Sequence, residues 1–150
     1  MPADDHLAVV KNIYRAFSAG KLEEIRLYIE EDFQTSFNAF GQPGLYKNVL
    51  SYHAWSHISS DKELVEVLKR DLAEWTANER TTSLTFFVSE PEQATPMVVC
   101  VFEIDYIVRP TGKKVRQKKV HLWTFDKATS KVKRLEHFDD TAQVVDAFTP

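Results

Sequence analysis

Three residues near the end of the chain could exchange protons with a bound molecule. His121, His137 and Asp139 lie in two segments, 115–125 and 132–139, that are rich in β-branched and aromatic residues. Alternate side chains of a strand share a face, so His137 and Asp139 point the same way. An apolar wall raises the pKa of a carboxylate toward that of a useful acid or base, and an imidazole can stabilise an enolate oxygen. The pattern predicts Asp139 as the acid/base, with both histidines orienting a substrate and stabilising its oxyanion.

Aromatic side chains would form the walls of this site. Trp123 shares the face of His121, and Tyr106 lies on the apolar, inward face of segment 97–108, where it could offer a hydroxyl. Residues 45–59 hold a further aromatic group without a clear period, and we expect them to form a partly irregular segment that covers the site. The candidate substrate-binding residues are Tyr106, Trp123, Tyr52, His53, Trp55 and His57.

Each candidate also has a structural alternative. Asp139 could cap a short terminal helix over residues 142–148. His121 and His137 could be hydrogen-bonded residues of the sheet. The aromatic residues of segment 45–59 could form a surface cluster, and packing is the alternative for the other aromatic candidates. The sequence leaves these alternatives open.

Neither a metal nor an organic cofactor is predicted. His53 and His57 have the four-residue spacing of helical metal ligands, but no carboxylate or cysteine companion accompanies them. Cys100 lies in the apolar run 97–102 and has no evident activating base, so we expect a core residue. Enolate chemistry needs only a base, an oxyanion partner and a dry cavity.

Composition excludes several classes of protein. The chain has 150 residues, of which 43% are hydrophobic and 27% charged, and this predicts one globular domain over residues 1–150. The net charge of −3 opposes binding to nucleic acids and to anionic membranes. The basic run 113–119 predicts a solvated hairpin end, and an anionic group on a substrate or partner is the alternative. No secretory signal or membrane-spanning segment is evident, so we expect a cytoplasmic protein.

Helices are predicted in the first half of the chain. A first helix ends at Gly20, and a short second helix runs to Ile29 and is closed by the acidic residues 30–32. Ser60 and Glu63 form a capping box, and the helix that it opens should continue to about residue 78.

Strands dominate the second half. After a short strand over residues 33–40, four long strands are predicted over 81–88, 97–108, 115–125 and 132–139, joined by short connections that imply antiparallel neighbours. A brief helix over 142–148 would end the chain. This order predicts an α+β fold, in which a cone-shaped, curved antiparallel sheet wraps around three N-terminal helices.

Three local patterns resemble those of the nuclear transport factor 2 superfamily, in its SnoaL-like branch of polyketide cyclase-like proteins. The junction Ala19-Gly20-Lys21-Leu22 looks like the opening "NAGD-L" pattern of the family. The helix over residues 60–68 looks like its third helix. The stretch Val132-Lys133-Arg134-Leu135-Glu136-His137-Phe138-Asp139 is similar to the "GKIVEHWD" ending of SnoaL-like cyclases. The resemblance extends over nearly the whole chain and implies the fold described above.

The resemblance carries over to individual residues only in part. The acid/base aspartate of the cyclase pattern falls on Asp139, and the carboxylic acid that ketosteroid isomerase-like members carry on the penultimate strand falls on His121. The catalytic tyrosine and aspartate of those members fall on Ile13 and Phe37. These departures argue against a steroid-isomerase mechanism.

The first hypothesis is therefore a cofactor-independent enzyme of the cyclase or isomerase type that acts on a small apolar or aromatic carbonyl compound. A non-catalytic ligand-binding or protein-interaction module is the alternative, and a filled interior would favour it. A dehydratase or lyase that uses two histidines is a further alternative. The family's habit of back-to-back pairing also implies a homodimer through the outer sheet face, on which Val99, Val101 and Ile107 are expected.

Overall fold

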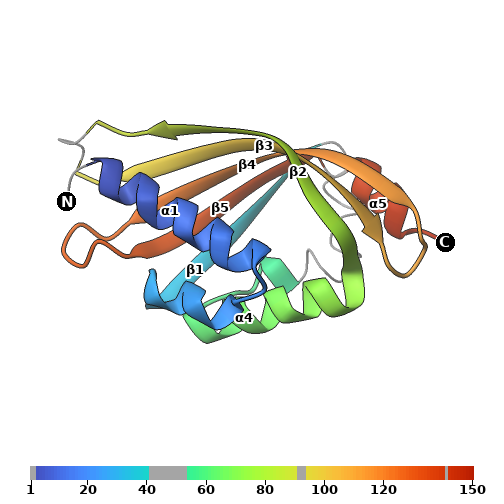
Figure 1. Ribbon diagram of the computed structural model, residues 1–150, viewed down its shortest axis with the longest axis horizontal. Helices are drawn as coiled ribbons and strands as arrows, with labels where there is room; N and C mark the ends of the chain where they lie inside the picture. Colours follow the sequence, from blue (N-terminus) through green and yellow to red (C-terminus); the bar gives the residue numbers. More distant parts are fainter. Residues whose placement is uncertain (1–2, 41–53, 91–93, 141) are drawn as a thin grey trace.

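The computed structural model describes residues 3–40, 54–90, 94–140 and 142–150 and has the predicted α+β architecture. Figure 1 shows one curved, unclosed sheet with helices on its concave side. The elements follow in the order α1 (Ala3–Ser18), η1 (Leu22–Leu27), β1 (Ile29–Phe40), α4 (Asp61–Arg70), η2 (Asp71–Trp75), β2 (Thr76–Val88), β3 (Met97–Val108), β4 (Lys114–Phe125), β5 (Val132–Asp140) and α5 (Ala142–Phe148).

The sheet has the strand order β1-β5-β4-β3-β2. Strands β2 to β5 form an antiparallel series, as the short connections between them predicted. The edge strand β1 instead runs parallel to β5. Strand β1 can pair in this direction because the long connection from β1 to β5, which includes α4, η2 and the strands β2 to β4, lets the chain return to the same end of the sheet.

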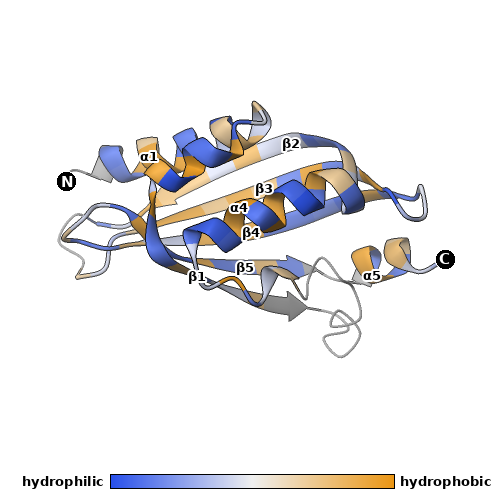
Figure 2. Ribbon diagram, turned by 90° about the horizontal axis from the view of Figure 1, so that it is seen from below, coloured by the Kyte–Doolittle hydropathy of each residue, from blue (hydrophilic) through white to orange (hydrophobic). Residues whose placement is uncertain are grey.

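Helices α1 and α4 pack on one side of the sheet, and Figures 1 and 2 show this from two directions. The apolar face of α1 is buried through Val10 and Ile13, and that of α4 through Leu64 and Leu68. These side chains meet the inward residues of the strands in the main hydrophobic core. The amphipathic spacing of the helices therefore decides which face of the sheet becomes the interior.

The second predicted helix is shorter than expected. Gly20 takes the left-handed conformation, with φ of 71°, and ends α1 as predicted. The segment that follows, η1, is a 3₁₀-helix and ends at Leu27. Ile29 is the first residue of β1, so the prediction that residues 30–32 close a helix was wrong. The backbone N–H of Val132 donates to Tyr28 O, which joins this segment to the start of β5.

The capping box at the start of α4 is confirmed, with one change of partner. Ser60 Oγ accepts the backbone N–H of Glu63 at 3.1 Å. Glu63 Oε2 reaches back to the backbone N–H of Ser59, not Ser60, at 2.8 Å. Both bonds satisfy N–H groups that a helix start leaves without partners.

Helix α4 ends earlier than predicted and leads directly into β2. A single π-helical turn, η2, follows Arg70, and β2 begins at Thr76 and not at residue 81. Thr76 pairs with Val108, so the pairing of β2 with β3 overrides the helical continuation. Strand β2 then loses register twice, between Ala77 and Arg80 and again between Thr81 and Ser83. Each shift is a one-residue bulge that bends the strand around the interior.

None of the described helices is long and apolar enough to cross a membrane.

Candidate functional site

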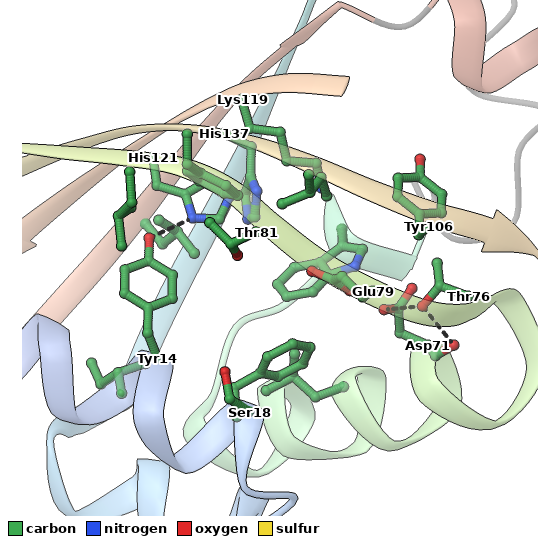
Figure 3. A pocket seen from close by; sticks show the side chains of 18 of the residues that line it. Tyr14, Ser18, Asp71, Thr76, Glu79, Thr81, Tyr106, Lys119, His121 and His137 are labelled. Carbon is green, nitrogen blue, oxygen red and sulfur yellow. Dashed lines mark hydrogen bonds between the residues drawn. The ribbon is translucent and has the colours of Figure 1, made fainter. Parts of the chain in front are cut away.

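A cavity of about 1130 Å³ lies between the concave face of the sheet and the helices. Its walls are mostly aromatic and aliphatic, with polar groups from α1, η2 and the strands β2 to β5. Figure 3 shows Tyr14 and His121 at one side of this cavity and Asp71 and Thr76 at the other. A cavity of this size and lining is typical of sites for small organic molecules.

The first polar group of the cavity joins α1 to β4. The hydroxyl of Tyr14 lies 2.9 Å from His121 Nδ1. The indole Nε1–H of Trp123 donates to the same hydroxyl at 3.0 Å. In the tautomer of His121 that leaves Nδ1 without a proton, the hydroxyl accepts from Trp123 and donates its own proton to Nδ1. The second ring nitrogen of His121, Nε2, then carries a proton, and it has no partner among the described residues.

Both histidines of the site are held in their neutral form. Burial is the largest cause that lowers the pKa of His121 well below its ordinary value, and His137 and Lys119 add to it. Burial, followed by the charge of Lys119, lowers the pKa of His137 to about 3. The two rings lie with centroids 4.6 Å apart, and Trp55 packs against His137 at 4.8 Å. A neutral imidazole can donate a hydrogen bond to a developing oxyanion without giving up its proton.

Asp139 belongs to a second polar group, which runs along β3, β4 and β5. Its side chain is fully buried. Gln117 Nε2 donates to Asp139 Oδ2 at 3.3 Å, and Lys119 Nζ lies 3.7 Å from the same oxygen. Tyr106 OH in turn donates to Gln117 Oε1 at 3.2 Å. Burial raises the pKa of Asp139, and Lys119 and Gln117 only partly offset it. The other carboxylate oxygen, Oδ1, accepts no hydrogen bond among the described residues.

Two more carboxylates face the cavity from the bent segment between α4 and β2. Asp71 lies on the π-helical turn and accepts a hydrogen bond from the hydroxyl of Thr76 at 3.1 Å. Burial and the neighbouring charge of Glu79 raise the pKa of Asp71 to about 6. Glu79 lies in the first bulge of β2, next to the left-handed Asn78, and lines the cavity. Desolvation by the surrounding protein raises the pKa of Glu79, although Lys119 opposes the shift.

Lys119 corrects the sequence-based interpretation of the basic run. The prediction placed all of residues 113–119 at a solvated hairpin end, but Lys119 points inward and lines the cavity. Burial disfavours its charge, but the carboxylates of Asp139, Glu79 and Asp71 outweigh burial and raise the pKa of Lys119. Alternation along β4 already puts Lys119 on the face of His121, so the signal was present in the sequence.

The structure brings most of the predicted site residues together. His121, His137, Asp139, Tyr106, Trp123 and Trp55 all line the cavity. His57 is exposed and is not among the lining residues. Tyr52 and His53 lie outside the described residues. The bonds of Asp139 to Gln117 and Lys119 correct the alternative that it caps the terminal helix.

Several polar residues of the cavity were not among the predicted site residues, and Tyr14, Asp71, Glu79 and Lys119 are among them. Tyr14 lies one position after Ile13, onto which the catalytic tyrosine of the ketosteroid isomerase-like proteins fell. Asp71 was assigned to the interior of a long helix. The local periodicity of the sequence does not predict the π-helical turn that directs Asp71 into the cavity. It also does not predict the bulge of β2 that directs Glu79 there.

The remaining reactive groups of the described part of the chain have structural roles. Cys100 is fully buried, and burial raises its pKa to about 11, so its thiol stays protonated. Within the described ranges, no group of three or more His, Cys, Asp or Glu side chains could hold a metal ion.

Comparison with known proteins identifies the fold. No family model and no curated protein matches the sequence. A nuclear transport factor 2-like protein from Burkholderia xenovorans is similar in structure, with a TM-score of 0.75 over 98% of each chain at 17% identity. A candidate polyketide cyclase from Xanthomonas campestris has a TM-score of 0.67 over 97% of each chain at 12% identity. A ketosteroid isomerase-like protein from Erwinia carotovora has a TM-score of 0.60, covers 91% of this chain and 95% of its own, and is 14% identical. At these identities the likeness is one of fold, so the chain has the nuclear transport factor 2-like fold that its sequence resembled.

Proposed function

We propose that this protein binds a small, largely apolar carbonyl compound in its cavity and converts it by acid/base chemistry of the cyclase or isomerase type. In this reaction Asp139 removes a proton from the carbon beside the carbonyl group. His121 donates a hydrogen bond to the carbonyl oxygen as it becomes an enolate oxygen. Return of the proton to another position, or attack of the enolate on a second carbonyl carbon, completes the isomerisation or cyclisation.

The observation that carries the proposal is the hydrogen bond between Tyr14 and His121. With Tyr14 as the donor to Nδ1, the proton of the neutral ring lies on Nε2, which has no partner among the described residues. The lowered pKa of His121 keeps this donor neutral at physiological pH. A preorganised donor in a dry cavity stabilises a developing negative charge far more than it would in water.

Asp139 suits the role of the base. It is fully buried, one of its oxygens has no partner among the described residues, and its pKa is raised by burial. A carboxylate in such surroundings binds a proton more strongly than one in water, which favours proton abstraction from carbon. Lys119, 3.7 Å away, favours the charged form of the carboxylate and so partly opposes the effect of burial.

The names of similar structures agree with this reaction type, since they include a candidate polyketide cyclase and a ketosteroid isomerase-like protein. The arrangement differs from that of a steroid isomerase in the position of the residue that acts as the catalytic base. The position expected for its aspartate on β1 holds Phe37, which lines the cavity without a carboxylate. The phenol of Tyr14 stands one position after buried Ile13. The base would therefore come from β5.

The alternative of a protein-interaction module without chemistry would be favoured by a filled interior. The cavity of about 1130 Å³ therefore weighs against that alternative.

Deuterium exchange tests the proposal directly. Apolar ketones, beginning with tetralone and cyclohexenone, are incubated with the protein in heavy water, and proton NMR follows exchange beside the carbonyl group. We expect catalysed exchange by the unmodified protein and its loss in Asp139→Asn. Glu136→Gln is the matched control, because Glu136 is a half-buried carboxylate of the same strand that does not line the cavity. Equal exchange rates for Asp139→Asn and the unmodified protein would overturn the assignment of the base.

Dehydration is a second candidate function, favoured by the contact of the two neutral imidazoles at 4.6 Å. One ring would accept the proton beside the carbonyl group while the other donates to the leaving hydroxyl. Appearance of enone absorbance from an apolar β-hydroxy ketone would support this function, and exchange without loss of water would exclude it for that substrate.

A further inference from the structure

The cavity holds more negative than positive charge at the side away from Tyr14. Asp71, Glu79 and Asp139 line it there, together with the single ammonium group of Lys119. Lys119 forms an ion pair with Asp139 and, among the described residues, with neither of the others. Lys119 therefore neutralises Asp139 most directly. Asp71 and Glu79 face the cavity without an ion pair among the described residues and interact with Lys119 only at longer range.

Nearby cations do not supply the missing charge. Arg109 acts on Asp71 from behind, but it is outside the cavity lining, and its Nε donates to the carbonyl oxygens of Leu72 and Thr76. Arg80 lines the cavity but pairs with Asp105 at 3.4 Å.

The other cations of the lining, Lys11 and Arg15, belong to α1, the helix that carries Tyr14. Both are exposed to solvent. Lys11 lies over the ring of Phe86, with 5.6 Å between Nζ and the ring centroid. These groups therefore do not neutralise the side of the cavity where Asp71 lies.

The position of Asp71 is a second reason to expect a hydrogen-bond donor on the ligand. Its side chain is only 9% exposed, and it lines the cavity. The hydroxyl of Thr76 donates to one carboxylate oxygen, and the other oxygen, Oδ1, has no partner among the described residues. Asp71 lines the cavity, so this oxygen can accept a hydrogen bond from a ligand. Glu79 is open to the cavity and can approach the same ligand group.

We propose that the ligand of this cavity carries a protonated amine on its apolar body, and that Asp71 and Glu79 receive that amine. This inference rests on the proposed function, since it places the amine and the reacting carbonyl group in the same cavity. An ammonium group supplies both the positive charge and the N–H donors that the two carboxylates lack. The aromatic walls add cation–π attraction and accept the apolar body. An organic cation fits better than a metal ion, because no described group of side chains could hold a metal.

The acid–base properties of the two residues agree with this assignment. The pKa of Asp71 is raised to about 6 by burial and by Glu79, and that of Glu79 is raised by burial. A bound ammonium group would relieve the repulsion between them and lower both values. Amine binding should therefore weaken as the pH falls below about 6, when Asp71 takes up a proton.

A pair of matched probes tests the inference by calorimetry. Phenylbutylamine and phenylbutanol share one carbon skeleton and differ in the ammonium and hydroxyl groups. We expect the amine to bind about tenfold more tightly at neutral pH, since a hydrogen bond to a charged group exceeds one to a neutral group by this order. Asp71→Asn and Glu79→Gln should each reduce the preference, while Glu103→Gln, a carboxylate that is outside the cavity lining, should preserve it.

Each outcome separates the inference from the proposed function. Equal affinity for the two probes, or a preference that survives in both Asp71→Asn and Glu79→Gln, would overturn the amine assignment even if ketone exchange is observed. An amine preference that depends on these carboxylates would support it even if no exchange is found. Melting temperatures of the variants without ligand show whether each is folded, and the pH dependence in the unmodified protein is a second measurement that needs no variant. Binding that does not weaken toward acid pH would also count against the assignment.

Discussion

Tyr14 and His121 are joined by a hydrogen bond of 2.9 Å between a hydroxyl and Nδ1, although 107 positions separate them in the sequence. Their rings are nearly parallel, at 12°, with centroids 6.1 Å apart. Trp123 completes the arrangement by donating to the same hydroxyl. The first helix and the fourth strand thus meet in a polar contact inside a largely apolar cavity, and the direction of this hydrogen bond is coupled to the tautomer of His121.

Tyr14→Phe should therefore change the chemistry of His121. Without the phenol proton, Nδ1 is no longer held as an acceptor, and the tautomer becomes mixed. We expect nitrogen NMR of the His121 ring to show this change and catalysed ketone exchange to fall about a hundredfold. Tyr28→Phe is the control, since Tyr28 is half-buried and does not line the cavity. An unchanged tautomer in Tyr14→Phe would contradict the assignment.

Lys119→Met should destabilise the fold because it leaves Asp139 charged and buried without its partner. Breaking a buried pair from one side typically costs about 3–5 kcal/mol. Replacing both residues, as in Lys119→Met with Asp139→Asn, should restore part of that stability. Urea unfolding measures both effects. If Lys119→Met is as stable as the unmodified protein, the contact of 3.7 Å between Lys119 and Asp139 contributes nothing to the stability of the fold.

Asp71→Asn should stabilise the protein at neutral pH. The pKa of Asp71 is about 6 in the folded state and 3.8 ordinarily, so the folded protein binds more protons between these values. Stability contributed by this group is therefore lost as the pH rises from about 4 to 6. The asparagine removes that loss and still accepts the hydrogen bond of Thr76. We expect a gain of about 2–3 kcal/mol near pH 8 and no gain near pH 3.

Thermal unfolding of Asp71→Asn across that pH range, compared with the unmodified protein, checks the sign. The comparison cancels the titration of other groups, including His137, whose lowered pKa has the opposite effect on stability. If Asp71→Asn stabilises the protein equally at acid pH, the removal of the Asp71 charge is not the cause of the added stability.

Ser60→Ala should cost about 1 kcal/mol of unfolding free energy, the usual effect of removing an N-cap side chain. The reason is that the backbone N–H of Glu63 loses its acceptor at 3.1 Å. Lys62→Ala, in the same exposed turn, is the control, and urea unfolding is the measurement. Equal losses in both variants would assign the effect to general helix propensity.

The outer face of the sheet is proposed as a homodimer surface. Val99 and Val101 are half-exposed there, and Val99 pairs with exposed Phe87 on one side and Leu122 on the other. These side chains form an apolar patch that a second copy could cover, and Ile107 lies on the same face beyond Glu103 and Asp105. Val101→Lys should shift sedimentation from dimer to monomer, whereas Lys118→Ala, on the same face, should not. A monomer at high concentration in the unmodified protein would reject this surface.

Local patterns in the sequence were enough to predict much of the framework. Alternation of apolar residues located β3 with its observed bounds and put His137 and Asp139 on one face, which the structure shows to be the inward one, and the predicted terminal helix α5 also has its observed bounds. The capping box located the start of α4. These features depend on side-chain period and on contacts between near neighbours, so they can be read without the fold.

The alternation of side chains along β4 also indicated an inward position for Lys119, which was not predicted. Lys119 shares the period of His121 and Trp123 along β4, but its place in a basic run favoured a solvated position. Its inward orientation is tolerated because three carboxylates face it across the cavity, and two of these are far away in the sequence.

The sequence by itself determined the class of fold, the presence of the strands, the start of α4 and the shared face of His137 and Asp139, since each depends on local periodicity or capping. Only the tertiary structure decided that β1 pairs in parallel with β5, that Tyr14 binds His121, and that Asp71 and Glu79 enter the cavity. The physical reason is that these features arise where long-range strand pairing overrides local preference. Pairing of Thr76 with Val108 ends a helix in a π-helical turn, and register shifts in β2 turn Glu79 inward.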